Sequence, residues 1–448
     1  MADINKLSVI TGSKKNPLEL LQSLYALSFI GGKMYVLVKT EIESVQDGLA
    51  EAQVHFYEYH KVAKILMERT LEASSIACSK PQNVMKEFLS NPHTTTYKTQ
   101  AFSPIKQSDD CLNLWSGHTA VPKQGDWKVI EDYLFDVISS GNNELYKYTY
   151  HTLAHNIQKP HIKTGICIVY VGEEGVGKGI KGQLLETIWG KTTLLVQDMD
   201  TVVGHFNKAI EQVFNVFLDE ALFSGNKKQT DKLKSMITEP SITIEGKYEP
   251  QRKMLSYHRF WAATNRSHFA HVRTDDRRFL FIRVSNCHKQ DTAYFSKVVN
   301  ALHDGHTLEA FVYDLLNADL SDFDFRKKPN TEETWEQKKR SLSGVSRYWF
   351  EVLTTANFTT TKNHYERDHL WHEPSFIAGD ELLQRYKNHD KNSERYESVQ
   401  ISTVYQEILK LCPSASRKKK DKRGVAYPHI DIAREEFEES VNYKGIPW

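Results

Sequence analysis

The stretch Gly172-Glu173-Glu174-Gly175-Val176-Gly177-Lys178-Gly179 lies near the middle of the chain and is the strongest indication of the fold of its core. It follows an apolar run at residues 166–171 and precedes a helical pattern at residues 180–189. A strand, a glycine-rich turn and a helix in this order let backbone N–H groups converge on a phosphate at a helix N-terminus. The pattern G-x-x-x-x-G-K therefore predicts an ATP-binding loop, in which the ammonium of Lys178 contacts the β- and γ-phosphates. A glycine-rich turn without a ligand is the alternative. The residues expected around the phosphates are Gly172, Glu174, Gly175, Val176, Gly177, Lys178, Gly179 and Ile180.

The residue after the lysine departs from the common pattern. It is Gly179, whereas a serine or threonine at this place usually offers a hydroxyl to Mg²⁺. The metal would then be held by phosphate, water and a distant acid, and Asp219 is the candidate because it follows the apolar run 213–218. Glu220 would polarise the attacking water. Adjacent acids after a strand are common, and it is the loop about forty residues upstream that favours the functional interpretation.

Two later segments supply further polar candidates. Asn265 ends the segment that begins with the apolar run 260–263, where it could orient the water or sense the γ-phosphate. Arg277 and Arg278 come just before the next apolar run, a natural position for an arginine finger that reaches the γ-phosphate of a neighbouring subunit. A solvated turn with two surface arginines is the alternative for this pair.

The alternation of short apolar runs with helical patterns predicts an α/β fold. Short apolar runs bounded by turns are typical of strands buried on both faces, so a sheet with helices on both faces is expected. Regular helical patterns predict a helical N-terminal region, a polar linker near residues 90–110 and a helical lead-in to the core. The apolar runs are residues 166–171, 213–218, 260–263 and 279–284, and the expected regions are 1–110 (helical, a collar or partner-binding module), 111–164 (lead-in), 165–330 (ATPase core) and 331–448 (helical, with a small winged-helix-like module).

Four segments together, GEEGVGKG, FNVFLDEA, FWAATN and DDRRF, fall within about 110 positions. They resemble a superfamily 3 helicase domain of the AAA+ class, and in particular the helicase cores of phage and mobile-element primase-helicases, in which a glycine commonly follows the lysine. The resemblance covers roughly residues 110–330. It implies a P-loop NTPase core in a hexameric ring with ATP sites between subunits. Such a ring would translocate on single-stranded DNA with 3′ to 5′ polarity and unwind forked duplex DNA.

The same resemblance gives a meaning to the segment between Asp219 and Asn265. Residues 242–248 look like the region that carries the pore hairpin of these helicases, so Lys247, Arg252 and Lys253 would contact DNA phosphates inside the ring. From the residues alone, the segment is a plausible β-hairpin with basic side chains around a glycine. Surface lysines without a ligand are the alternative.

A basic cluster lies near the C-terminus. Residues 417–423 carry six basic side chains and one acidic side chain, so the cluster has a local charge of +5 and the rest of the chain sums to about −4. The cluster could sit in a loop or wing of a winged-helix module and bind DNA. A solvated charge run is the alternative. The expected DNA contacts are Arg417, Lys418, Lys419 and Lys420.

The composition of the chain restricts the classes of protein and of metal site that remain possible. The 448 residues hold 58 basic and 57 acidic side chains, a formal charge of +1, which excludes only a uniformly basic coat. Five scattered cysteines without C-x-x-C spacing argue against a disulfide framework or zinc ribbon and favour the reducing cytoplasm. No apolar run is long enough for a membrane span.

The pairs His151/His155 and His268/His271 lack further ligands, so Mg²⁺ bound with the nucleotide is the only metal expected. Residues 1–110 show no metal pair that would support primase chemistry.

These observations favour an ATP-dependent DNA helicase or replication initiator of a phage or other mobile element. Its expected partners are DNA, further copies of itself and replication proteins of the host or element. The second hypothesis is an origin-binding protein that uses ATP as a structural switch with little hydrolysis, since Gly179 offers no hydroxyl to the metal. A small-molecule phosphotransferase is a weaker third, because it leaves Arg277, Arg278 and the basic cluster without a role.

Overall fold

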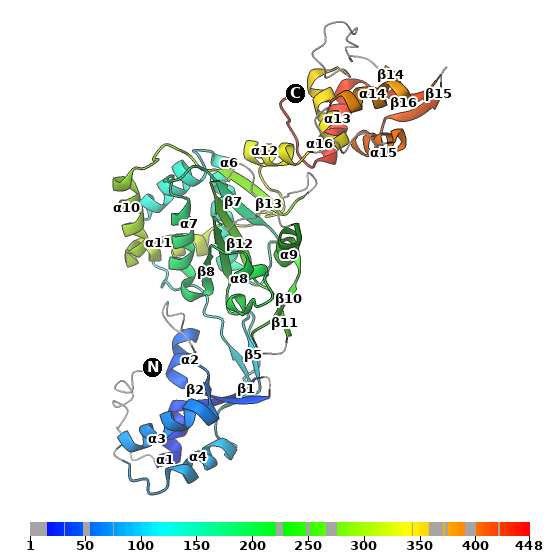
Figure 1. The fold of residues 1–448 in the computed structure, drawn as a ribbon. Helices are drawn as coiled ribbons and strands as arrows, with labels where there is room; N and C mark the ends of the chain where they lie inside the picture. The colour runs from blue at the N-terminus through cyan, green and yellow to red at the C-terminus, as the bar shows by residue number, and fades with distance from the viewer. Residues whose placement is uncertain are drawn as a thin grey trace. The chain divides into compact units, whose positions relative to one another are not determined.

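The computed structural model describes residues 16–30, 32–47, 54–74, 76–220, 227–247, 251–265, 276–342, 344–357, 371, 375–389, 400–419 and 422–448. The chain divides into two compact units, one of residues 1–265 and 283–327 and the other of residues 266–282 and 328–448. Figure 1 traces the elements of both units in chain order. Among the helices of the described ranges, none is both long enough and apolar enough to cross a membrane.

The N-terminal part of the first unit contains a sheet that the prediction of a helical region did not include. Its four strands have the order β3-β2-β1-β4, and β1 pairs with β2 in antiparallel register from Tyr25/Val38 to Ile30/Lys33. Gly32, just before β2, has a φ of +76°. The expected helices are present as α1, α3 and α4, but β1 and β2 lie between α1 and α2. The elements are α1 (Pro17–Leu24), β1 (Tyr25–Ile30), β2 (Lys33–Val38), α2 (Lys39–Gln46), β3 (Tyr57–Glu58), the π-helical turn η2 (Tyr59–Ala63), α3 (Lys64–Ala73), α4 (Pro81–Ser90) and β4 (Thr96–Tyr97).

The physical reason for this error is visible in the burial of β1. Leu24, Tyr25, Ala26 and Leu27 are all buried, so an apolar run that continues α1 in the sequence is a fully buried strand in the structure. Periodicity alone does not separate a buried strand from a buried helix in so short a run. The expected linker near residues 90–110 is also partly wrong, because it contains β4 and β5 (Thr99–Ala101), and β5 pairs in parallel with β6 (Cys111–Asn113).

The core of the first unit is a sheet in which the strands β7, β12, β9 and β8 lie side by side in this order. Strands β7, β12, β9 and β8 run parallel to their neighbours in this group, as buried apolar runs predict. All four expected strands are present, and β8 was missed. The strands are β7 (Cys167–Val171), β8 (Thr193–Val196), β9 (Asn215–Asp219), β12 (Arg259–Thr264) and β13 (Phe279–Arg283), and a separate hairpin is formed by β10 (Ser241–Ile244) and β11 (Arg252–Leu255).

Helices pack on this sheet and on each other. Helix α7 contacts β8, β9 and β12, and α10 and α11 both contact α7, as Figure 1 shows beside the sheet. A Cβ atom at Gly182 of α7 would lie 3.0 Å from the ring of Phe217, so glycine is needed for this close approach of helix and strand. The helices and helical turns are α5 (Lys128–Asp132), η3 (Tyr133–Ile138), α6 (Asn143–Gln158), α7 (Lys178–Trp189), η4 (Gly190–Thr192), α8 (Asp200–Val203), η5 (Lys208–Ile210), α9 (Lys227–Thr238), α10 (Thr292–His303) and α11 (Gly305–Asn317).

The second unit contains a three-stranded antiparallel sheet with the order β14-β16-β15. Its apolar core includes the rings of Trp349, Trp371 and Tyr427, which contact one another. Gly424 lies so close to the backbone of Ile377 that a side chain there would displace the neighbouring strand. The elements are α12 (Glu332–Ser341), α13 (Gly344–Thr355), β14 (Ser375–Ala378), α14 (Gly379–His389), α15 (Ile401–Leu411), β15 (Ser416–Lys419), β16 (Arg423–Tyr427) and α16 (Ile430–Ser440).

One lysine of α7 is buried at an energetic cost. The side chain of Lys181 is fully buried, and its Nζ has no hydrogen-bond partner among the described residues, lying 5.5 Å from the ring centre of Trp261. Burial lowers the pKa of this lysine to about 7. Between that value and the ordinary lysine pKa near 10.5, the unfolded chain binds a proton that the folded chain does not, so lysine at this position destabilises the fold as the pH falls.

We predict that Lys181→Met stabilises the protein at pH 7 by about 1–4 kcal/mol, because methionine fills the same space without a charge to desolvate. The gain should shrink as the pH rises toward 10.5 and stay level below about 7, as measured by denaturant unfolding across this range. Lys147→Met on exposed α6 surface is the control. A destabilised Lys181→Met variant, or a gain independent of pH, would contradict the prediction.

Candidate functional site

The glycine loop between β7 and α7 is held from several sides. Gly177 has a φ of +88°, and a Cβ atom there would overlap the ring of Phe295. Its carbonyl accepts a hydrogen bond from Tyr133 Oη at 3.0 Å, and the carbonyl of Gly175, whose φ is +76°, accepts one from the Gln290 N–H at 2.9 Å. These contacts hold the loop in a conformation that only glycine adopts without strain.

Lys178 opens α7 directly after this loop. Its side chain is only 7% exposed, and Nζ donates hydrogen bonds to the carbonyl oxygens of Gly172 at 2.8 Å and Glu173 at 2.7 Å. Nζ also lies 3.9 Å from Glu220 Oε1. Burial lowers the pKa of Lys178, and the carboxylates of Glu220, Asp219 and Glu174 oppose that shift. The ammonium is therefore held at the start of the helix, facing acids from a different strand.

The two acids lie at the end of β9, which Asp219 closes and Glu220 follows. Asp219 pairs with Ala263 of β12, and the N–H of Glu220 donates to the Ala263 carbonyl at 3.0 Å. The backbone of Glu220 has a φ of +49°, which is uncommon for a residue other than glycine. Strained backbone conformations of this kind are found most often at functional sites. Burial raises the pKa of Asp219, and Lys178 opposes the rise. The strand therefore delivers both carboxylates to the same edge as the loop.

Asn265 joins the acids to the loop. Its backbone N–H donates to Glu220 Oε2 at 3.2 Å, and its side-chain Nδ2 donates to Glu174 Oε1 at 3.2 Å. The expected residues Glu174, Lys178, Glu220 and Asn265 thus form one connected group, with Asp219 beside them. They come from the carboxyl ends of β7, β9 and β12, the edge at which parallel sheets bind ligands.

This group has the chemistry of an anion and divalent-cation site. The N-terminus of α7 and Lys178 suit a phosphate, and a carboxylate pair with an adjacent amide offers the oxygen ligands that Mg²⁺ prefers. Gly179 is exposed, and a Cβ atom there would meet nothing within 4 Å, so the place usually taken by a hydroxyl-bearing side chain is open. The residues present therefore fit a magnesium ion held by Asp219 and phosphate.

Several residues at the loop were not foreseen. Tyr133 contacts it from η3, Gln290 from the segment before α10, and Phe295 from α10 itself. Glu173 of the loop accepts a hydrogen bond from Asn286 Nδ2 at 3.0 Å. These residues lie about 40 to 120 positions from the loop in sequence. No local pattern marks them, because only the packing of distant segments brings them together.

The expected basic hairpin is present as β10 and β11. Ile244 pairs with Arg252, and Thr243 pairs with Lys253. Arg252 forms an ion pair with Glu211, so its charge is already engaged within the chain, while the side chain of Lys253 is exposed. Lys247 is exposed in the turn that follows β10. The contact of these residues with DNA stays a prediction.

Arg277 and Arg278 belong to the second unit. Arg278 Nη1 lies 3.5 Å from Asp276 Oδ2, and the Asp276 side chain is almost fully buried. Arg277 is exposed, and its carbonyl accepts a hydrogen bond from Lys328 Nζ at 2.6 Å. The role of an arginine finger requires a second subunit, so it stays a prediction for both residues.

The C-terminal basic residues line a groove. Arg417, Lys418 and Lys419 are exposed on β15, and the guanidinium of Arg417 lies 5.3 Å from the ring centre of Tyr405 on α15. Lys420 lies outside the described residues. The groove, of about 760 Å³, is lined by Gly379, Asp380, Ile401, Ser402, Tyr405, Arg417, Lys418, Lys419, Lys422, Arg423 and Gly424. Lys422 is paired with Asp380 at 2.8 Å, so the positive charge of the groove is partly offset.

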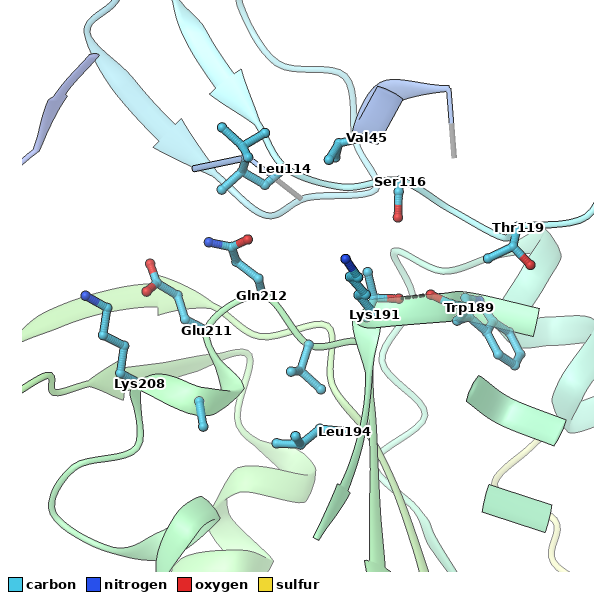
Figure 2. A pocket seen from close by; sticks show the side chains of 14 residues that line it. Val45, Leu114, Ser116, Thr119, Trp189, Lys191, Leu194, Lys208, Glu211 and Gln212 are labelled. Atoms are coloured by element: carbon cyan, nitrogen blue, oxygen red, sulfur yellow. Dashed lines mark hydrogen bonds between the residues drawn. The ribbon is translucent and has the colours of Figure 1, made fainter. Parts of the chain in front are cut away.

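Another cavity, of about 310 Å³, lies in the first unit and is shown in Figure 2. Its walls include Thr192 and Leu194 at the start of β8 and Val213 just before β9. These are the amino ends of parallel strands, whereas Asp219 ends β9 at the opposite edge. The cavity is therefore separate from the glycine loop, and the loop is the better candidate for chemistry.

The described residues contain no group of three or more His, Cys, Asp or Glu side chains arranged to hold a metal. Burial lowers the pKa of His155 to about 4, as for an imidazole packed in a core. His268 and His271 lie outside the described residues.

Comparisons with known proteins bear on the fold. A family model described as a family of unknown function, DUF5906, matches residues 170–278. No curated protein matches the chain. The chain is similar to solved structures of the C-terminal region of NrS-1, each covering 93% of this chain and 100% of that chain. The apo structure of NrS-1 residues 305–718 has 16% identity and a TM-score of 0.67, an A-form apo structure has 16% and 0.68, and an A-form apo structure of residues 305–718 has 15% and 0.64. This likeness shows that the two chains share a fold.

The geometry of the loop predicts different effects for two glycine substitutions. Gly177→Ala should strain the backbone by about 1–3 kcal/mol and push the Phe295 ring, so thermal stability should fall. Gly179→Ala should leave stability unchanged or slightly raise it, because the position is exposed, helical and unobstructed. Thermal unfolding of the two variants tests this, and equal stabilities of the two would contradict it.

Proposed function

We propose that the protein is an ATP-dependent DNA helicase or replication initiator of a phage or mobile element. The observation that carries the proposal is the group Glu174, Lys178, Asp219, Glu220 and Asn265 at the carboxyl edge of a parallel sheet. A cationic loop at a helix N-terminus that faces two acids is suited to bind a triphosphate and activate water against it. This is the chemistry of a P-loop NTPase core.

Each residue has a distinct part in this proposal. The glycine loop and Lys178 would bind the β- and γ-phosphates. Asp219 would hold Mg²⁺ together with phosphate oxygens, and the metal would supply positive charge against the negative charge that develops during phosphoryl transfer. Glu220 orients and polarises the attacking water, and its hydrogen bond from Asn265 fixes the carboxylate. Arg277 or Arg278 would reach the γ-phosphate of a neighbouring subunit in a hexameric ring.

The sequence resemblance supports the choice of process. Residues 110–330 resemble the helicase cores of phage and mobile-element primase-helicases, and the solved structures of the C-terminal region of NrS-1 share the fold of this chain. That likeness, together with the glycine loop, favours a motor for phage replication over a small-molecule phosphotransferase. Single-stranded DNA would pass Lys247 and Lys253 on the β10–β11 hairpin, whose basic side chains suit a sequence-independent grip on phosphates.

The second unit supports binding of duplex DNA. Its elements α13, β14, α14, α15, β15 and β16 follow one another in the order of a winged-helix module, with β15 and β16 as the wing. Arg417, Lys418 and Lys419 on β15 would contact phosphates. Beside them, α15 exposes Ser402, Thr403 and Gln406, side-chain types that read base edges.

The alternative is an origin-binding protein that uses ATP as a switch. Gly179 favours it, because the metal lacks the usual hydroxyl ligand. The carboxylate of Glu220, which accepts a hydrogen bond from the Asn265 N–H, favours ATP hydrolysis instead. A switch would not need a carboxylate positioned to activate water. Measuring ATP turnover with and without single-stranded DNA separates the two functions.

We predict that Lys178→Ala and Glu220→Gln reduce DNA-stimulated ATP hydrolysis at least a hundredfold and abolish unwinding of a forked duplex. Lys178→Ala removes the phosphate ligand, so it should also weaken ATP binding, whereas Glu220→Gln should retain binding and lose hydrolysis. Glu186→Gln, an exposed carboxylate on α7, is the control and should keep full activity. Unwinding at the normal rate by either active-site variant would overturn the proposal, and tight ATP binding with almost no turnover in the wild type would favour the switch.

A further prediction concerns β15. Neutralising Arg417, Lys418 and Lys419 together by glutamine should weaken binding to duplex DNA and reduce the slope of log K against log salt concentration by about 2–3. A triple variant of equal charge in the same unit, Lys339→Gln/Arg347→Gln/Lys444→Gln, should leave the slope unchanged. Fluorescence anisotropy at several salt concentrations measures both. Equal slopes for the two triple variants would remove the basic strand from the DNA interface.

A further inference from the structure

A cavity of about 410 Å³ lies beside the glycine loop, and its lining combines Gly175 of the loop with side chains of α10. We infer that this cavity binds the nucleobase of the nucleotide. The inference rests on the proposed function of the loop and adds the position of the base and the residues that contact it. Its lining includes Gly175, Gln290, Phe295, Ser296, Val299 and Asn300.

The direction of the bound nucleotide follows from the order of the strands. Asp219, Glu220 and Asn265 follow β9 and β12, which lie to one side of β7. The segment that contains Val284 lies on the other side, since the Val284 N–H donates to the Val171 carbonyl at 2.8 Å. A triphosphate across the start of α7, with its γ end at the acids, must therefore direct its nucleoside end toward this second segment.

That segment is tied to the loop at two points. The Gln290 N–H donates to the Gly175 carbonyl at 2.9 Å, and Glu173 accepts a hydrogen bond from Asn286 Nδ2 at 3.0 Å. Gln290 has a φ of +62°, a conformation that a glutamine seldom adopts and that the surrounding contacts must maintain. These hydrogen bonds hold the wall of the cavity at a defined position relative to the phosphate loop.

The lining has the chemistry that a base requires. The ring of Phe295 and the side chain of Val299 provide apolar surface, and Ser296 and Asn300 project from the same helix, α10. Hydroxyl and amide groups both donate and accept hydrogen bonds, as the edge of a purine does. The volume falls within the range of small-ligand pockets. Phe295 also packs against Gly177, so one side chain would contact both the phosphate loop and the base.

The test compares two probes, the non-hydrolysable ATP analogue AMPPNP and inorganic tripolyphosphate, each titrated with Mg²⁺ into the full chain by calorimetry. Ser296→Trp fills the cavity from an exposed helical position, and Lys297→Trp, exposed on the same helix but outside the cavity, is the matched control. We expect Ser296→Trp to weaken AMPPNP binding at least tenfold and to change tripolyphosphate binding less than twofold. Lys297→Trp should bind both probes as the wild type does.

Each outcome is decisive. AMPPNP binding by Ser296→Trp at wild-type affinity would overturn the inference, and so would a wild type in which AMPPNP gains nothing over tripolyphosphate. If Ser296→Trp loses both probes, Asn300→Ala decides: a loss of AMPPNP affinity of threefold or more, with tripolyphosphate retained, supports the base site, and unchanged affinity overturns it. A wild type that binds neither probe contradicts the proposed function of the loop itself, which is a different result.

Discussion

The backbone pairing of β12 with its two neighbours is the constraint on which the candidate site depends. Thr264 accepts a hydrogen bond from the Gly172 N–H at 3.1 Å, and Ala263 accepts one from the Glu220 N–H at 3.0 Å. These two bonds align the ends of β7, β12 and β9, so the glycine loop, the amide and the acids begin at the same level of the sheet. A slip of one residue between β9 and β12 would turn the acids to the other face of the sheet.

Buried cations connect the lead-in segment to this sheet. Arg259 at the start of β12 is 2% exposed, and its guanidinium donates to Asn156 Oδ1 at 2.8 Å and to the carbonyls of Pro160 and Ile162 at 3.0 and 2.7 Å. Lys163 donates to the carbonyls of Met236 and Glu239 and to Ser256 Oγ. Burial lowers the pKa of Arg259 to about 9 and that of Lys163 to about 7. Both charges are compensated by hydrogen bonds, which Lys181 lacks among the described residues.

The loop and the cavity beside it share one structural element. Phe295 packs against Gly177, and Gln290 bonds to Gly175, so the start of α10 is coupled to the phosphate loop by contact rather than by sequence. A nucleotide bound by both the glycine loop and the cavity would contact residues 172–179 and residues 290–300, which are more than 100 positions apart in the sequence. This arrangement also explains why Gly177 tolerates no side chain while Gly179, two residues later, would.

The sequence by itself determined the loop, the acids and four of the strands, β7, β9, β12 and β13. Local spacing is sufficient for these features, since a strand, its terminal polar residue and a glycine turn each extend over fewer than about ten residues. It did not determine the hairpin β1–β2, because the buried run that continues α1 has no period that separates strand from helix. Only the tertiary structure decided that Asn265 bonds to both Glu220 and Glu174, that Phe295 and Gln290 enclose the glycine loop, and that Arg252 is engaged by Glu211. The physical reason is that these contacts join segments remote in the chain, and their geometry follows from strand order and register, which are properties of the packed sheet.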